Sequence, residues 1–233
     1  MRLRSLLALG LLAGAASLLA EPARAQDTRP GIAVLRFDNG GSYGQDAENF
    51  AALEVGLQQM LTTEFAQNPG LRVVDRSRIN EIIREQDLGA TGRVDANTAA
   101  KIGRIVGARY VVLGGFIDFY GDFRLDLRVV NVETGEIVRT ERVRKKREDL
   151  YDIVVEAAVN LTNGLNLPPL PAQVRQSRES RAIPTEAVTM YTRGLLYAER
   201  GQNDRAAVLF ARAKEIFPSY TEVDAALQQI GRG

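Results

Sequence analysis

The order of two apolar patterns near the start of the chain restricts the fold more than any other feature. Residues 31–37 form a short apolar run rich in branched side chains, and the turn residues 38–41 end it, which predicts a buried strand. Apolar residues then recur at helical spacing until an Asn-Pro-Gly stretch at 68–70, which predicts a helix over 47–67. We therefore expect the strand to lie centrally in a sheet and the helix to pack on that sheet.

The following segments continue the pattern. A second strand is expected at 71–74, followed by a helix whose apolar side chains fall within 79–83. A third helix is expected to begin at Asp95 and to end at Gly107. Strands and helices thus alternate through the first half of the chain.

Three further strands are predicted at 109–118, 123–129 and 136–144. Apolar and charged residues alternate strictly in the second of them, so one of its faces is expected to be dry and the other wet. Because the connections are short, an antiparallel meander is expected, followed by a helix through 150–161. The predicted fold class is α/β (α+β), with a mixed sheet and helices packed on it.

The first 25 residues have the pattern of a cleavable export signal. Met-Arg-Leu-Arg is followed by an apolar run from Ser5 to Ala20, and Ala23-Arg-Ala25 supplies the small residues that signal peptidase accepts. The apolar run is shorter than the roughly 20 residues of a membrane span. We expect residues 1–25 to be a signal peptide and the protein to reside in the periplasm, with membrane contact at most peripheral.

The composition excludes several kinds of chemistry. The chain has no Cys, which excludes disulfides, lipid attachment at a Cys and Cys-containing zinc sites, and it has no His, which excludes Ser-His and Cys-His dyads. Removing residues 1–25 takes three Arg and one Glu from 30 basic and 29 acidic residues, which leaves 27 and 28. This balance gives no reason to expect nucleic-acid binding. The glycines at 89–92 and 114–115 match no phosphate-binding pattern, and no cofactor is expected.

The chain divides into two expected units. Residues 26–165 are predicted to form the α/β domain, 166–184 a Pro-rich linker, and 185–233 a helical unit with a capping helix. Because the linker lacks apolar periodicity, we expect it to make few contacts. The α/β domain is then expected to remain folded when residues 182–233 are deleted.

Four separate segments resemble the CsgG family, the curli production and transport components. They are Val-Val-Asp-Arg-Ser-Arg-Ile-Asn-Glu-Ile-Ile-Arg-Glu-Gln at 73–86, Ala-Ala-Lys-Ile-Gly at 99–103, Gly-Ala-Arg-Tyr-Val-Val-Leu-Gly at 107–114 and Leu-Arg-Val-Val-Asn-Val-Glu-Thr-Gly-Glu at 127–136. The resemblance implies a periplasmic α/β domain that acts in envelope assembly, secretion or scaffolding and is not an enzyme. It extends to the LpoB-like activators of cell-wall synthases and to the N-terminal domain of TolB.

Three alternatives to such a scaffold remain open. The first is an outer-membrane secretion pore subunit of the curli type, although only a tight turn is expected at 118–122, where a long membrane hairpin would be needed. The second is an activator of cell-wall synthases. The third is a carboxylate-based envelope hydrolase.

The C-terminal unit resembles a single tetratricopeptide repeat over 187–220. The matching small, aromatic and proline positions are Gly194, Tyr197, Ala206, Phe210, Ala213 and Pro218, with Met190 where the family usually has Trp. The resemblance implies a helical hairpin that binds a protein partner or a second copy of the chain. The positions it assigns to partner binding are Tyr191, Leu195, Ala198 and Glu199. The alternative is that this face packs on the chain's own α/β domain, since one repeat cannot bury its own apolar surface.

Two charged groups are further candidates. A basic segment is expected to contact an anionic surface or to be a soluble edge strand; its candidate residues are Arg142, Arg144, Lys145, Lys146 and Arg147. Asp118, Asp122 and Asp126 cluster around a turn, where they are either a cation or acid/base site or ordinary solvated carboxylates. Their spacing matches no calcium loop.

Overall fold

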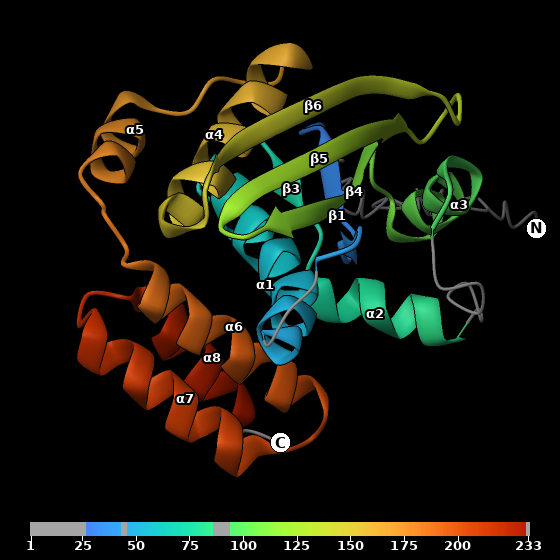
Figure 1. Ribbon diagram of the computed structural model, residues 1–233. Helices are drawn as coiled ribbons and strands as arrows, with labels where there is room; N and C mark the ends of the chain where they lie inside the picture. The colour runs from blue at the N-terminus through green and yellow to red at the C-terminus, as the bar shows by residue number, and fades with distance from the viewer. Residues whose placement is uncertain (1–26, 43–45, 86–93, 232–233) are drawn as a thin grey trace, which may run out of the picture.

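The computed structural model describes residues 27–42, 46–85 and 94–231, and it shows a mixed sheet covered by helices on both faces (Figure 1). The helices α1 (Ala47–Ala66) and α4 (Leu150–Gly164) cover one face. The helices α2 (Arg76–Glu85) and α3 (Ala96–Val106) cover part of the other. The predicted signal peptide at 1–25 lies outside the described residues.

The sheet confirms the predicted mixture of parallel and antiparallel strands. Its order is β3-β1-β4-β5-β6, and β2 also pairs with β4. The strands are β1 (Gly31–Val34), β2 (Asp38–Asn39), β3 (Arg72–Val73), β4 (Tyr110–Phe119), β5 (Asp122–Asn131) and β6 (Ile137–Lys146). β1 runs parallel to β3 and β4, whereas β4, β5 and β6 form the expected antiparallel meander. β1 therefore has a neighbour on both sides, as predicted.

Alternation along the strands divides the apolar residues between two cores. On β1, Ile32 and Val34 join the core beneath α1 and α4, whereas Ala33 joins the core beneath α2 and α3. β5 follows the same rule, since its odd-numbered apolar residues from Phe123 to Val129 join the core beneath α1 and α4, and Val130 joins the core beneath α2 and α3. The α/β fold class predicted from the patterns is confirmed.

Helix α3 begins and ends at the residues that the sequence predicted. The Asp95 side chain accepts a hydrogen bond from the Thr98 backbone N–H at 2.7 Å, which satisfies one of the free donors of the first turn. Gly107 has a φ of 66°, a left-handed conformation that favours glycine at this position.

Helix α1 is buried on two sides, because the C-terminal helices pack on the side that faces away from the sheet (Figure 1). These helices are α6 (Thr185–Glu199), α7 (Asn203–Ile216) and α8 (Thr221–Ile230). α6 approaches α1 so closely that a Cβ atom at Gly56 would overlap the Thr192 side chain, and a Cβ atom at Gly194 would likewise overlap Phe210 of α7. The predicted helical hairpin is confirmed; its identity as a tetratricopeptide repeat stays a prediction.

The predicted linker contains a helix, α5 (Ala172–Glu179), and is tied to both units. Arg178 is buried against α1, and Arg181 forms an ion pair with Glu222 of α8. The expectation that residues 166–184 make few contacts is therefore wrong. Arginine side chains, which no apolar periodicity marks, make these contacts.

No helix within the described part of the chain is both long and apolar enough to cross a membrane.

Candidate functional site

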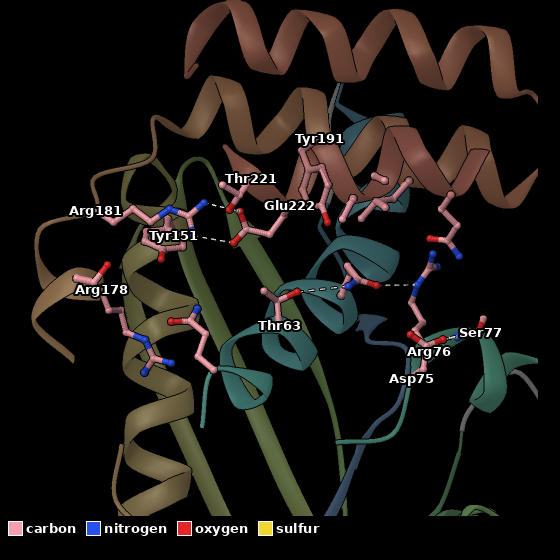
Figure 2. Close-up of a pocket in the computed structure, with 17 residues that line it drawn as sticks. Thr63, Asp75, Arg76, Ser77, Tyr151, Arg178, Arg181, Tyr191, Thr221 and Glu222 are labelled. Carbon is pink, nitrogen blue, oxygen red and sulfur yellow. Dashed lines mark hydrogen bonds and ion pairs between the residues drawn. The ribbon is translucent and has the colours of Figure 1, made fainter. Parts of the chain in front are cut away.

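A cleft of about 540 Å³ opens where the helical unit meets the α/β unit (Figure 2). Its walls come from α1, the start of α2, the end of α5 and the outer side of α8. The residues that line it are Gln59, Thr63, Gln67, Asp75, Arg76, Ser77, Tyr151, Ser177, Arg178, Arg181, Tyr191, Leu195, Thr221, Glu222, Ala225, Ala226 and Gln229. Most of them carry hydrogen-bonding groups, so the cleft is suited to a polar partner.

Arg181 and Glu222 join α5 to α8 at one end of the cleft. The Arg181 guanidinium donates to both carboxylate oxygens of Glu222, with 2.6 Å between Nη1 and Oε1, and it lies 5.7 Å from the Tyr151 ring centre. Burial is the largest single influence and acts to raise the pKa of the Glu222 carboxyl, but the hydrogen bonds and positive charge of Arg181, together with smaller hydrogen bonds, outweigh burial and lower this pKa. The pair fixes this end of the cleft.

Arg178, which lines the cleft, belongs to a buried ion pair with Glu64 of α1. The Arg178 Nε lies 2.6 Å from Glu64 Oε2, and the Arg178 Nη2 donates to the Glu64 backbone carbonyl at 2.8 Å. The two side chains are 5% and 2% exposed, and the Tyr151 hydroxyl donates to Glu64 at 3.3 Å. Burial raises the pKa of the Glu64 carboxyl, and the attraction to Arg178 offsets this only in part. Glu64 thus depends on Arg178 to stay ionised.

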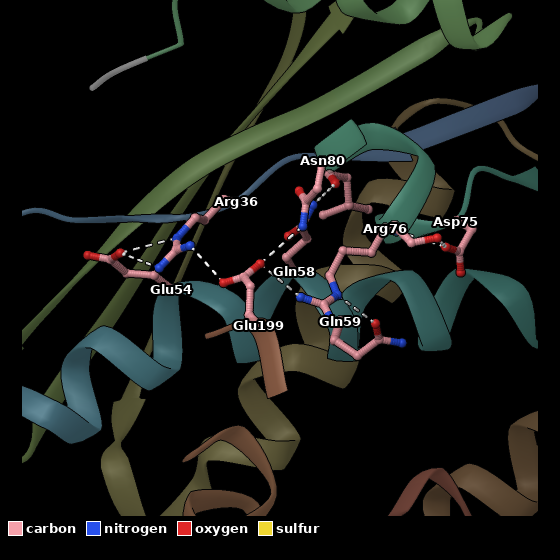
Figure 3. A network of polar contacts seen from close by, with 10 residues as sticks. Arg36, Glu54, Gln58, Gln59, Asp75, Arg76, Asn80 and Glu199 are labelled. Carbon is pink, nitrogen blue, oxygen red and sulfur yellow. Dashed lines mark hydrogen bonds and ion pairs between the residues drawn. The ribbon is translucent and has the colours of Figure 1, made fainter. Parts of the chain in front are cut away.

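A polar network joins the C-terminal end of α6 to the α/β unit (Figure 3). The Glu199 carboxylate accepts hydrogen bonds from Arg36 at 3.0 Å, from Asn80 at 3.1 Å and from Arg76 at 3.2 Å. Arg36 also pairs with Glu54 of α1 at 3.2 Å. Because Arg76 belongs both to this network and to the cleft wall, the network also positions the cleft.

The candidate partner-binding face of α6 packs on the chain itself. Tyr191 and Leu195 are 2% and 4% exposed, Ala198 is half-buried, and Glu199 belongs to the network described above. This burial agrees with the alternative that the face packs on the chain itself, since Tyr191 lies against Phe210 and Tyr220 and α6 packs on α1. Partner binding through these four residues stays a prediction, and only the edges of Tyr191 and Leu195 reach the cleft.

The three candidate aspartates do not converge on a common point. Asp118 is buried and accepts a hydrogen bond from the Gly121 backbone N–H at 2.8 Å. Asp122 and Asp126 lie on the opposite face of the sheet, where Arg144 and Arg142 bind them. The hydrogen bonds from Arg144 lower the pKa of Asp122. In the part of the chain that the structure describes, no three His, Cys, Asp or Glu residues are grouped to hold a metal ion.

The basic segment lies on β6, the edge strand, and η1 (Arg147–Asp149) continues it. Most of its cations have acidic partners: Arg142 with Asp126, Arg144 with Asp122, Lys145 with Glu156, and Arg147 with Asp46 and Asp118. Lys146 belongs to the same strand. The position agrees with the soluble-edge alternative. Contact of these five residues with an anionic surface stays a prediction.

Comparison with known proteins supports the resemblance seen in the sequence. Residues 12–124, slightly less than half of the chain, match the family described as "Curli production assembly/transport component CsgG". A curated relative, "Putative adenylate cyclase 3" of Rhizobium meliloti (strain 1021), is 26% identical over 218 residues. That match covers 92% of this chain but 35% of the relative, so the chain spans about a third of the relative's length.

Solved structures with a similar arrangement come from several bacteria. The LpoB C-terminal domain from Salmonella enterica is 19% identical, with a TM-score of 0.40, and the match covers 53% of this chain and 87% of that domain. TolB from Acinetobacter baumannii is 15% identical, with a TM-score of 0.37 and coverage of 71% and 32%. Lipoprotein GNA1162 from Neisseria meningitidis is 15% identical, with a TM-score of 0.36 and coverage of 57% and 98%.

Proposed function

We propose that this chain is a non-enzymatic binding or scaffold protein of the cell envelope, related to the CsgG family, that holds a protein partner in the cleft between its two units. The observation that carries the proposal is the cleft itself. Its hydrogen-bonding walls come from both units. Glu199 and Arg76 join those units directly, and the linker joins them through the Arg178–Glu64 and Arg181–Glu222 pairs. A surface of this kind is preorganised, so the cleft loses little conformational entropy when a partner binds.

The family match supports a role in the envelope, since its description names assembly and transport. The export signal predicted at 1–25 supports a periplasmic location. The proposal also includes a periplasmic location, a tetratricopeptide repeat at 187–220 and self-association of the chain.

The carboxylates with which an envelope hydrolase would act are engaged in other interactions. Asp122 and Asp126 bind arginines of β6, and Asp118 holds the β4–β5 turn. A general acid and base must both reach one substrate. Here Asp118 lies on the face of the sheet opposite to the other two, which favours the binding function over hydrolysis.

A second candidate follows from the curated relative. Because the match covers nearly the whole of this chain and about a third of a protein named as a putative adenylate cyclase, the second candidate function is synthesis of cyclic AMP. The two candidates are distinguished by incubating the purified chain with ATP and a divalent cation. Formation of cyclic AMP by this chain would contradict the non-enzymatic proposal.

Site-specific photocrosslinking in the native envelope tests the proposed cleft. A photoreactive residue at Ser177 or Gln229, exposed positions on the α5 and α8 sides of the cleft, is expected to give a discrete crosslink to the same protein partner. The matched control is Val208, which is 70% exposed on α7 and does not line the cleft. Crosslinks of equal yield at Val208, or none at either cleft position, would contradict the proposal.

A further inference from the structure

The β4–β5 hairpin ends in two exposed aromatic side chains. Phe119 is 69% exposed and Tyr120 is 95% exposed, and their rings meet edge to face with 4.9 Å between the ring centres. An exposed apolar cluster costs free energy in water unless another surface covers it. The tip is narrow, because only Tyr120 and Gly121 separate the two strands.

The geometry of the turn does not account for a tyrosine at its tip. Tyr120 and Gly121 have φ values of 53° and 86°, a two-residue turn with both residues left-handed, for which Asn-Gly is the favoured pair. A side chain with a Cβ atom is disfavoured in this left-handed conformation. Strained residues of this kind are concentrated at functional sites.

The turn is also held rigidly. The Gly121 N–H donates to the Asp118 carboxylate at 2.8 Å, and the Arg147 N–H donates to the Gly121 carbonyl at 2.9 Å. The Asp118 N–H in turn donates to the Ser42 hydroxyl at 2.8 Å. The two aromatic rings are therefore presented on a preorganised support.

Cations lie behind the tip on one face of the sheet. Cross-strand pairing puts Phe119 and Lys146 on either side of Asp122, and it puts Arg124 beside Arg144 in the next outward-facing row. Strand residues rise about 3.4 Å each, so this second row lies about 7 Å from the first. The first row adjoins the tip, and the second lies about one Debye length behind it, which is about 8 Å at physiological ionic strength. These three cations lie beside two carboxylates, because Asp122 binds Arg144 and Asp126 binds Arg124, so the group keeps a net charge of +1 (three positive against two negative).

We propose that this hairpin tip is an interfacial anchor for an anionic lipid bilayer. Phe119 and Tyr120 enter the headgroup region, and Lys146, Arg144 and Arg124 lie against lipid phosphates. Aromatic side chains are favoured at the membrane interface, and nearby Lys and Arg side chains are attracted to an anionic leaflet. A narrow tip with cations behind it fits a fluid interface better than a flat protein surface. The inference goes beyond the cleft and does not depend on it.

A single tryptophan reports whether the tip enters the bilayer. The chain contains no Trp, so Tyr120→Trp gives emission from position 120 alone, whatever other part of the chain touches the vesicle. With phosphatidylglycerol vesicles we expect a blue shift of the emission and quenching by brominated acyl chains. Pure phosphatidylcholine vesicles or high salt are expected to abolish both. Val208→Trp, at an exposed apolar position on α7, is the control and is expected to show neither change.

Tyr120→Asn provides the matched test of binding. Asn suits the left-handed turn position, so the variant is expected to fold at least as well as the parent and to bind anionic vesicles several-fold less. Emission from Tyr120→Trp that stays unshifted with anionic vesicles would overturn the proposal. It would indicate that the tip contacts a protein instead of a bilayer. An equal shift at Val208→Trp would overturn the proposal as well. Neither result bears on crosslinking at the cleft, so this proposal and the proposed function fail separately.

Discussion

Deletion of residues 182–233 is expected to leave a chain that does not fold cooperatively. The deletion removes α6, α7 and α8 and uncovers the outer side of α1, where Gly56 and Met60 pack against α6. It also removes Glu222 and Glu199, which leaves Arg181 and Arg76 without their ion-pair partners. Loss of a sigmoidal urea transition, together with aggregation, is the expected result.

A point substitution tests the packing inside the helical unit without shortening the chain. Tyr191→Ala empties a buried position between Phe210 and Tyr220, whose ring centres lie 5.9 and 5.0 Å from that of Tyr191. Truncation of a buried aromatic to Ala costs about 3–5 kcal/mol of unfolding free energy. Val208→Ala on exposed α7 is the matched control and is expected to change little. Equal stability of Tyr191→Ala and Val208→Ala would contradict the packing of Tyr191, and a truncated chain that melted like the parent would show that the helical unit is an independent annex.

Arg178→Met is expected to lower the unfolding free energy at pH 7 by about 3–5 kcal/mol, because it leaves the buried Glu64 carboxylate without its partner. Arg212→Met is the control, since Arg212 pairs with Glu215 on the exposed side of α7 and no measurable change is expected there. Restoration of most of the loss by Glu64→Leu in the Arg178→Met background would show that the uncompensated charge, and not lost packing, is the cause.

The loss in Arg178→Met is expected to depend on pH. Burial raises the pKa of Glu64 in the folded protein, and removal of Arg178 raises it further. The folded state then binds more protons than the unfolded state between the ordinary glutamate pKa and the raised one, so stability falls as the pH rises through this window. Urea titrations should therefore show a smaller difference from the parent at pH 5 than at pH 7. A difference that is constant with pH would show that Glu64 does not carry the effect.

Periodicity predicted the elements of the α/β unit well, because each of them buries one regular apolar face. The alternation of Phe123, Leu125, Leu127 and Val129 marks β5, and Asp95 and Gly107 mark the ends of α3. These are local signals, set by the backbone geometry of a strand or a helix end. They require no knowledge of what lies across the sheet.

The cleft was not predictable in the same way, because long polar side chains build it. Arg178 and Arg181 lie in a segment without apolar periodicity, yet they reach Glu64 and Glu222 in distant parts of the chain. One signal was present in the sequence: α1 has apolar residues around most of its circumference, which predicts a helix covered on two sides. That pattern favours packing of α6 on α1 over an exposed Tyr191.

Amide hydrogen exchange tests most directly whether the two units form one body with the cleft at their junction. If they do, the amides in the middle of α1 and of α6 exchange only through global unfolding, with the same free energy of opening as that measured by urea. The same free energy is expected for α8, apart from its last turn. Exchange of α6 and α8 through a separate opening of much lower free energy, while α1 stays protected, would contradict this account.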